Sequence, residues 1–438
     1  MNSRGEEGHK PLKIAFVLHA DGLEGTGRSH IEMVSELINS GSVVHTFLPQ
    51  DQSGLKAILV KMGSEVHVVG DLPWWTTASS MSVTNLISHK LVESLKELDP
   101  HLIITQTGVV PQGAIAARIL NKPHVWYLRE YINLDHSLRI PFRREAFSSI
   151  VLELSEKVIT NSEEIARYFY PEINSNIQVI HPLVLKFKPS QSRKIPSKSI
   201  RLGVVGTISE NKGQLIALEA LKHLVENGLN VSLEIYGGSN ESNLKKIRRF
   251  IEDNSLKSFV NIHGFVADRN EIYSNIDILL VPSIFEAYGR TALEGMQYSI
   301  PVIISDSAAM SANFVDKEIC LGFESQNSIS LAEGITLLMS NAELCSNLTL
   351  NASKFLSDES SNLGSSKINN LFREVVSNFD PENQNHDLSK ILFEIYRLTE
   401  EHSRLTEEIA AIHSSEFWRA TKPIRRFIGF IRVLLIRN

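Results

Sequence analysis

The segment PSIFEAYGRTALEGMQYSIP, residues 282–301, follows the apolar run from Ile276 to Val281 and carries two glutamates eight residues apart. This pattern predicts a buried strand, a glycine-centred turn and a helix, with Glu286 at the carboxyl edge of a sheet and Glu294 further along the helix. Open α/β sheets bind ligands at that edge. The unpaired N–H groups that begin such a helix favour an anion between the two carboxylates. A diphosphate flanked by hydroxylated sugars fits this arrangement.

Length and composition describe a globular protein of more than one domain. At 438 residues the chain is long enough for two or three domains with large cores. Apolar residues make up 42% and charged residues 21%, which sets disorder aside for most of the length. The net charge of −6 argues against nucleic acid as the main partner. Cys320 and Cys345 lack CxxC spacing, so they predict a reducing compartment, with no disulfide framework and no metal ion.

The N-terminal sequence predicts a cytoplasmic protein. After MNSRGEEGHK, the apolar run from Ile14 to Leu18 is too short for the core of a signal peptide. No stretch reaches the roughly 18 consecutive apolar residues that a membrane-spanning helix needs. Membrane contact is therefore expected to be peripheral, on the inner face of the cytoplasmic membrane.

Two successive α/β patterns divide the chain. Residues 1–185 alternate helical periodicity with the strand candidates KIAFVLH, VVHTFL, EVHVVG, HLIITQT, HVWYL and KVITNS. Residues 186–199, KFKPSQSRKIPSKS, are rich in Ser, Pro and Lys and are interpreted as a linker. The same alternation of strands and helices is predicted again over 200–379, where the strand candidates are RLGVVGT, VSLEIYGG, VNIHGFV, DILLVPS and PVIIS. We therefore predict an α/β fold of two doubly wound, Rossmann-like domains that face each other across a cleft, with a helical extension over 380–438.

The first part of that extension has an apolar repeat. Between 388 and 412 the apolar residues keep a three-four alternation for about three heptads, broken by His402. They are Ile391, Ile395, Leu398, Leu405, Ile409 and Ile412. The repeat predicts a short coiled coil and self-association through 388–412. The alternative is a single amphipathic helix packed on the body of the protein.

The end of the chain, 417–438, is basic and apolar. It holds six basic residues and no acidic one, interleaved with Trp418, Phe427, Phe430 and aliphatic side chains. A basic amphipathic segment with aromatic residues is typical of an interfacial membrane anchor. The alternative is a basic end that closes the core.

These motifs resemble the donor-site signature of the retaining, nucleotide-sugar-dependent glycosyltransferases of family 4, whose two-domain architecture is called GT-B. The ordered combination of GTISENKG, IYGG, GFV and the two-glutamate segment carries the resemblance. The signature positions are Pro282, Ser283, Glu286, Gly289, Glu294 and Gly295. The tail SSEFWRATKPIRRF is similar to one that follows coiled coils in bacterial polysaccharide-assembly transferases, with Ile424 in place of the usual Leu.

The resemblance assigns roles to residues of the second domain. Glu286 would bind hydroxyls of the transferred sugar beside its anomeric centre, and Glu294 would bind the ribose. Lys212 would neutralise the diphosphate, together with an arginine whose position holds Thr207 here. Donor binding would also involve the close backbone approach at Gly289, the amides of Arg290 and Thr291, and the nucleobase loop that ends at Val266. The family pattern has Gly at the position of Ser299 and Gly-Gly at the positions of Ala308 and Ala309. This chain therefore departs from the family pattern in these details of the donor site.

Two features of the first half are expected to face the same ligand. The glycine loop HADGLEGTGRS contains Gly25 and Gly27, which the resemblance brings to the donor phosphates from across the cleft. The segment KPHVWYLREY places Arg129 and Glu130 where many family members carry His-Asp. This pair forms a structural salt bridge or binds an acidic acceptor, and both alternatives stay open. Arg28 and Arg290 are further cations that would assist Lys212.

The activity that the resemblance implies is a hexosyltransferase reaction. A sugar would pass, with retention, from a nucleoside-diphosphate sugar to a hydroxyl of a glycan or lipid-linked acceptor, in the synthesis of a cell-surface polysaccharide. No metal is expected, because cationic side chains and a helix N-terminus can stabilise the leaving diphosphate. The alternatives are a nucleotide-sugar epimerase of the same fold, or a catalytically weak scaffold, for which Thr207 is the motivation.

Overall fold

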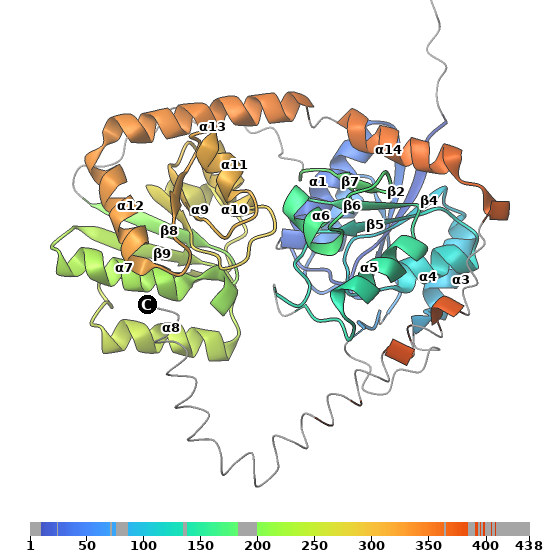
Figure 1. Ribbon diagram of the computed structural model, residues 1–438, viewed down its shortest axis with the longest axis horizontal. Coiled ribbons are helices and arrows are strands. Elements are labelled where there is room, and N and C mark those ends of the chain that lie inside the picture. Colours follow the sequence, from blue (N-terminus) through green and yellow to red (C-terminus); the bar gives the residue numbers. More distant parts are fainter. Residues whose placement is uncertain are drawn as a thin grey trace, which may run out of the picture.

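Two parallel β-sheets, each covered by helices, form two lobes of the molecule (Figure 1). The computed structural model describes residues 10–23, 25–70, 72–75, 86–134, 138–182, 199–362 and 365–383, together with 390–392, 395, 397, 398, 404 and 408. The predicted α/β class and the two doubly wound sheets are confirmed.

The N-terminal sheet has seven parallel strands in the order β3-β2-β1-β4-β5-β6-β7. Its strands are β1 (Lys13–Val17), β2 (Val43–Leu48), β3 (Glu65–Val68), β4 (Leu102–Thr105), β5 (His124–Leu128), β6 (Lys157–Thr160) and β7 (Ile177–Val179). Its helices are α1 (Gly25–Asn39), α2 (Leu55–Lys61), α3 (His89–Leu98), α4 (Gln112–Ile119), α5 (Arg144–Glu153) and α6 (Glu163–Phe169). The short strand β7 has no counterpart among the predicted strands.

The C-terminal sheet has six parallel strands in the order β10-β9-β8-β11-β12-β13. Its strands are β8 (Ile200–Val205), β9 (Val231–Tyr236), β10 (Val260–Gly264), β11 (Ile278–Val281), β12 (Val302–Ser305) and β13 (Leu321–Phe323). Its helices are the 3₁₀ turn η2 (Glu210–Lys212), α7 (Gln214–Glu226), α8 (Glu241–Asp253), α9 (Arg269–Ser274), α10 (Arg290–Gln297), α11 (Ser311–Asp316), α12 (Ser328–Ser340) and α13 (Ala342–Asn362).

The apolar runs become central strands because helices cover both faces of each sheet. All residues of β4, β5, β11 and β12 are buried. In each sheet the chain first adds strands on one side and then crosses to the other, so that β1 lies beside β4 and β8 lies beside β11. These two points, where the strand order reverses, are where doubly wound folds leave a crevice for a ligand.

A helical crossover returns the chain to the N-terminal lobe. Helix α13 runs along the C-terminal lobe, and α14 (Ser365–Asn378) lies on the N-terminal lobe (Figure 1). The apolar side chains of α14 pack in the same core as Phe16 of β1, and they are Ile368, Leu371, Phe372 and Val375. Although α14 falls within the predicted range 200–379 of the C-terminal domain, its apolar face therefore belongs to the N-terminal core.

The first residues of the apolar repeat in the extension also pack on the N-terminal lobe. Ile391 and Ile395 are buried in a core that contains Trp126, and Leu398 packs against it. This is the packing expected of a helix held on the body of the protein, whereas the coiled coil is not confirmed. Leu405, Ile409, Ile412 and the basic segment 417–438 lie outside the described residues. Within the described part of the chain, no helix combines the length and the apolar character needed to cross a membrane.

The packing of α14 predicts a stability effect in the N-terminal lobe. Replacing the fully buried Phe372 by Ala should lower the free energy of unfolding by about 3–5 kcal/mol, because it leaves a cavity in that core. Tryptophan fluorescence in a urea titration measures this, since Trp74, Trp75 and Trp126 lie in the N-terminal lobe. Leu350→Ala on the exposed side of α13 is the control and should change little. An unchanged transition in Phe372→Ala would contradict the packing.

Candidate active site

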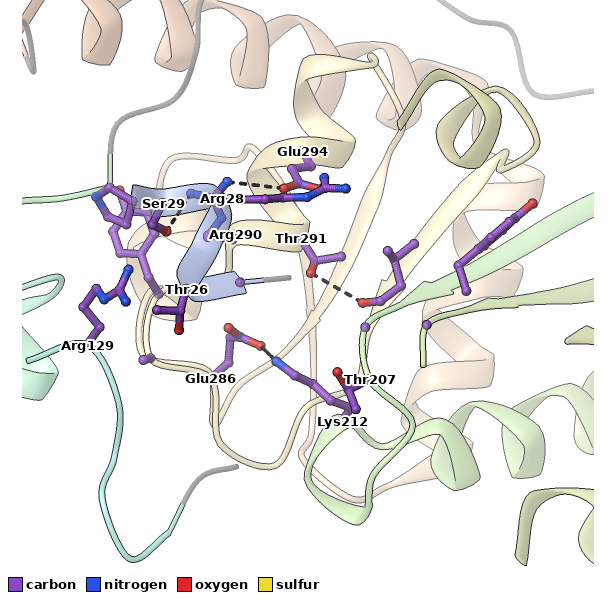
Figure 2. A pocket seen from close by; sticks show the side chains of 18 of the residues that line it. Thr26, Arg28, Ser29, Arg129, Thr207, Lys212, Glu286, Arg290, Thr291 and Glu294 are labelled. Carbon is purple, nitrogen blue, oxygen red and sulfur yellow. Dashed lines mark hydrogen bonds and ion pairs between the residues drawn. The ribbon is translucent and has the colours of Figure 1, made fainter. Parts of the chain in front are cut away.

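A pocket lies between the carboxyl edges of the two sheets, at the places where their strand orders reverse. The N-terminal wall contributes Thr26, Arg28, Arg129 and Asn161, among others, and the C-terminal wall contributes the predicted donor residues. Eight of the ten predicted site residues line it, namely Gly25, Thr207, Lys212, Val266, Glu286, Arg290, Thr291 and Glu294. Figure 2 shows Lys212 and Thr207 on one side of the pocket, Arg129 on the opposite side and Glu286 between them.

Lys212 and Glu286 meet at this edge although they are 74 positions apart. The loop after β8 carries Lys212, the loop after β11 carries Glu286, and the two strands are neighbours. The Lys212 Nζ lies 2.6 Å from Glu286 Oε2, and the hydroxyl of Ser283 donates to the same oxygen over 3.2 Å. The structure thus brings the predicted catalytic pair into direct contact.

The turn that carries Lys212 is fixed on the Glu286 loop by Asn211 and Gly213. The side chain of Asn211 donates to the carbonyl oxygen of Phe285 and accepts from the N–H of the same residue, each over 2.9 Å. Gly213 has φ 68°, and a Cβ on it would lie 2.0 Å from the carbonyl oxygen of Pro282. Only glycine fits at this close approach. Sequence reasoning missed Asn211, because nothing in the spacing marks its partner.

Helix α10 begins at the pocket. Gly289 precedes it with φ 90° and is not itself a lining residue, whereas Arg290 and Thr291 line the pocket. Gly295 allows α10 to lie close to β11, because a Cβ there would meet Leu279 Cδ2 at 2.3 Å. The first N–H groups of the helix are therefore held next to Lys212 and Glu286, where they favour an anion.

Glu294, on the second turn of α10, is surrounded by donors. Its Oε1 lies 2.9 Å from Arg269 Nη2 and 3.5 Å from Arg290 Nη2, and its Oε2 lies 3.9 Å from Arg28 Nη1. The hydroxyl of Tyr273 donates to Oε2 over 2.7 Å. Burial raises the pKa of Tyr273 and the charge of Glu294 raises it further, so this hydroxyl stays protonated. The predicted ribose role of Glu294 stays a prediction.

Arg290 connects the two lobes. Its guanidinium donates to both carboxylate oxygens of Glu32 on α1, over 2.7 and 3.0 Å, and to Ser29 Oγ over 3.0 Å. Burial alone would lower the pKa of Arg290, but the hydrogen bonds and charge of Glu32 outweigh it and raise that pKa. Arg28 and Arg290 were expected to assist Lys212. Instead, the side chains of both contact carboxylates of the protein.

The part of the pocket assigned to the nucleobase is formed by aromatic and apolar side chains. Val266, Phe265 and Tyr236 line it, and Phe265 is 47% exposed. The ring of His263 stacks on Tyr236 with centroids 4.2 Å apart. Gly264 has φ 70°, which turns the chain after β10 towards the pocket. A flat ring can be accommodated against Phe265.

The glycine loop of the N-terminal lobe is folded on itself. Gly25 begins α1 with φ 29° and lines the pocket. Gly27 is not a lining residue, and a Cβ on it would lie 1.9 Å from the carbonyl oxygen of Gly22. Gly27 therefore shapes the loop, while Gly25 is placed where a ligand can contact its backbone.

Arg129 and Glu130, which follow β5, do not form the salt bridge that was one of the two interpretations. The carboxylate of Glu130 accepts a hydrogen bond from the backbone N–H of Arg129 over 3.3 Å, and within the described chain its oxygens make no ion pair with that guanidinium. Burial raises the pKa of Glu130. Both residues line the pocket.

One group of side chains in the described residues has the spacing of metal ligands, and it lies outside the pocket. On β2 and β3, His45 Nδ1 is 3.2 Å from His67 Nε2 and 3.5 Å from Glu65 Oε2. The hydrogen bond between the rings and the contact with Glu65 already give each atom a partner. None of the three lines the pocket, so this group offers nothing to a reaction there.

Comparisons with known proteins relate this chain to glycosyltransferases. Residues 186–355 match the family model described as Glycosyl transferases group 1. The O-antigen biosynthesis glycosyltransferase WclY of Escherichia coli is 27% identical over 383 residues, which cover 83% of this chain and 100% of that protein. Protein CapJ of Staphylococcus aureus is 23% identical over 250 residues, 53% of this chain and 61% of CapJ.

Solved structures show the same fold. Anabaena Alr3699/HepE in complex with UDP and glucose superposes with a TM-score of 0.68 at 20% identity, covering 84% of this chain and 99% of that one. WaaG, a glycosyltransferase involved in lipopolysaccharide biosynthesis, gives a TM-score of 0.58 at 15% identity, covering 82% and 99%. The chain thus has the GT-B fold, and the family match and relatives together support a glycosyltransferase.

The contact between Glu32 and Arg290 predicts a large loss of stability when the carboxylate is removed. Glu32→Gln should lower the free energy of unfolding by about 3 kcal/mol, because it leaves buried guanidinium groups without their counter-charge. Chemical denaturation measures this. Glu36→Gln, the same change one turn further along α1, is the matched control and should change stability by less than about 0.5 kcal/mol. Equal stabilities of the two variants would contradict a buried ion pair between the lobes.

Proposed function

We propose that this protein is a retaining glycosyltransferase of family 4, which transfers a sugar from a nucleoside-diphosphate sugar to a hydroxyl acceptor. The observation that carries the proposal is the contact of Lys212 with Glu286 at the start of α10. One cation, one carboxylate and a row of helix N–H groups meet there, in a pocket between two doubly wound sheets. This combination suits a ligand that joins a diphosphate to a sugar.

The C-terminal wall would stabilise the leaving group. When the bond between the anomeric carbon and the phosphate oxygen breaks, negative charge builds on the diphosphate. Lys212, the N–H groups of Arg290 and Thr291, and the hydroxyl of Thr207 are the donors near it. A bound diphosphate would compete with Glu286 for Lys212 and free that carboxylate for the hydroxyls of the sugar. Preorganised donors of this kind are the largest contribution in many enzymes.

Retention would follow from attack on the face that the leaving group vacates. The acceptor hydroxyl forms the new bond to the anomeric carbon and gives its proton to the departing phosphate oxygen. This step depends on alignment and electrostatics more than on a strong base. We propose that this step needs no metal ion.

The acceptor is proposed to be a glycan or a lipid-linked glycan at the inner face of the cytoplasmic membrane, in the synthesis of a cell-surface polysaccharide. The relatives named for O-antigen biosynthesis support this, as does the capsular polysaccharide biosynthesis glycosyltransferase CapM of Staphylococcus aureus, 24% identical over 151 residues. Attachment would use the basic segment 417–438.

Binding of a nucleotide without metal is the first test. UDP, ADP, GDP and TDP are added in EDTA to the full chain, and the melting temperature is recorded, because a ligand that binds only the folded state raises it. One nucleotide should raise the melting temperature. Lys212→Ala should lower the affinity for that nucleotide by about 10-fold to 100-fold, since it removes a charged hydrogen-bond donor. Lys222→Ala, on the outer part of α7, is the control.

Transfer is measured with the matching nucleotide sugars. Glu286→Gln should keep nucleotide binding and lower transfer by roughly 100-fold or more, because that carboxylate contacts the sugar. Hydrolysis or a change of sugar configuration without an acceptor would favour the epimerase. An unchanged melting temperature with every nucleotide would favour the scaffold, and Thr207 in place of the family arginine would explain the lost binding.

Membrane attachment is tested by deletion. The chain that ends at residue 416 should lose binding to vesicles that contain anionic lipid, because it lacks all six basic residues of the tail. Flotation with anionic and with neutral vesicles measures this, with nucleotide binding as the check on folding. Equal flotation of the full and shortened chains would contradict the anchor.

A further inference from the structure

We infer that Arg129 and Asn161 form a subsite for an acidic sugar, on the N-terminal wall of the pocket. This inference rests on the proposed function, since it names the substrate class of the same site. Its ligand is a carboxylate carried by the sugar that is transferred or by the sugar that accepts it. No predicted role covered these two residues together.

Arg129 is a buried cation that forms no ion pair with any residue the structure describes. Its side chain follows β5, the residue is 7% exposed, and it points into the pocket in Figure 2. Within the described residues, the guanidinium makes one hydrogen bond, from Nη2 to the carbonyl oxygen of Gln106 over 3.3 Å, and its Nε has no partner. The ring of Tyr127 lies under it at 5.4 Å. A buried charge with so few partners is costly unless a counter-charge arrives.

The other arginines of the pocket differ from Arg129 in this respect. Arg28 and Arg290 also line the pocket, but each already contacts a carboxylate of Glu294, and Arg290 contacts Glu32 as well. Of the three lining arginines, Arg129 is therefore the one that a substrate anion can bind without competition from a protein carboxylate. An arginine fork also matches the geometry of a carboxylate.

The surroundings do not neutralise Arg129. His19 and His30 lie near enough to respond to its charge, and burial together with Arg129 lowers the pKa of His19 to about 4 and of His30 to about 3. Both rings are thus uncharged at neutral pH. Burial raises the pKa of Glu130, and the charge of Arg129, which is near enough to lower that pKa, has the smaller effect. Its carboxylate accepts a hydrogen bond from the backbone N–H of Arg129, and within the described residues it forms no ion pair with the guanidinium. A ligand anion can therefore pair with the guanidinium without displacing a protein carboxylate.

Asn161 adds a second requirement on the ligand. It follows β6, is 6% exposed and lines the same pocket. Its Nδ2 donates to the carbonyl oxygen of Arg129 over 3.1 Å, which joins the two residues, while its Oδ1 has no hydrogen-bond partner among the described residues. A ligand that satisfies both residues must offer an anionic acceptor to Arg129 and a hydrogen-bond donor to Asn161. A sugar with a carboxylate and hydroxyl groups offers both.

The position of the subsite places the carboxylate on a sugar rather than on the diphosphate. Lys212 and Thr207, which would hold the diphosphate, belong to the C-terminal wall, and Arg129 belongs to the N-terminal wall across the pocket (Figure 2). Glu286, assigned to the transferred sugar, is drawn between them. The order of charges across the pocket therefore runs from diphosphate to sugar to acidic group.

The experiment compares acidic with neutral ligands of the same shape, by isothermal titration calorimetry on the full chain. The donor arm uses UDP, UDP-glucose and UDP-glucuronate. The acceptor arm uses p-nitrophenyl glucuronide and p-nitrophenyl glucoside, each with and without UDP. In one arm the acidic ligand should bind about 10-fold to 100-fold more tightly than its neutral counterpart, which is the gain from a charged hydrogen bond. That arm identifies which sugar carries the acid.

The same titrations are repeated with Arg129→Gln, with Arg129→Lys and with the control Arg144→Gln, whose side chain lies outside the pocket. The glutamine variant should lose the preference for the acid, the lysine variant should keep part of it, and the control should keep all of it. UDP affinity should be the same in all four proteins, which also shows that the variants fold.

Three results would overturn the inference: no acidic preference in either arm, an unchanged preference in Arg129→Gln, or loss of UDP binding together with the preference. Failure of the proposed function is distinguishable, because UDP binding by the unaltered chain does not depend on Arg129. If UDP does not bind at all, the titrations of the glycosides without UDP still decide whether Arg129 selects an acid.

Discussion

Five charged side chains form a buried ion-pair cluster in the seam between the two lobes. Glu32 and Glu294 contact the guanidinium groups of three arginines, Arg28, Arg269 and Arg290. Removing charges from water is expensive, so such a cluster persists only when each member keeps its partners. Because Glu32 comes from α1 and the partner Arg290 from α10, separating the lobes would break the shortest of these contacts. The cluster has three positive and two negative groups, so it carries one net positive charge.

Helix α10 connects this cluster to the chemistry. Its first N–H groups face the pocket, Arg290 on its first turn reaches across to Glu32, and Glu294 follows on its second turn. An anion bound at the helix start and the contact between lobes therefore act on the same rigid element. Lys212 is a second connection, because its contact with Glu286 depends on Asn211 and on the close approach of Gly213 to Pro282. The site is thus shaped by backbone contacts as much as by the charges that a motif search detects.

The sequence predicted the parts of this arrangement that depend on local pattern. Buried parallel strands are continuous apolar runs, and the loops after β8 and β11 carry recognisable residues, so the fold and Lys212, Glu286 and Glu294 could be identified. The contact of Glu294 with Arg28 could not, since Arg28 is separated from it by most of the chain and no spacing relates the two. The core in which helix α14 packs could not be predicted for the same reason: its amphipathic pattern shows that one face is buried, but not which sheet covers it. Salt-bridge formation between Arg129 and Glu130 also depends on side-chain direction, which adjacency in sequence does not determine.

The two walls of the pocket divide recognition in a way that follows from where charge is compensated. On the C-terminal wall and in the seam, the cations contact carboxylates of the protein, so the proposed diphosphate would have to displace or share existing partners. On the N-terminal wall, Arg129 contacts a carbonyl oxygen and a ring, and an incoming acid would displace no carboxylate. Binding energy is greatest where a ligand supplies a partner that the protein lacks, because the cost of burying the unpaired group has already been met in folding. Under the proposed function, the C-terminal wall would recognise the part common to nucleotide sugars, and the selective part of the substrate would be left to Arg129 and Asn161 on the other sheet.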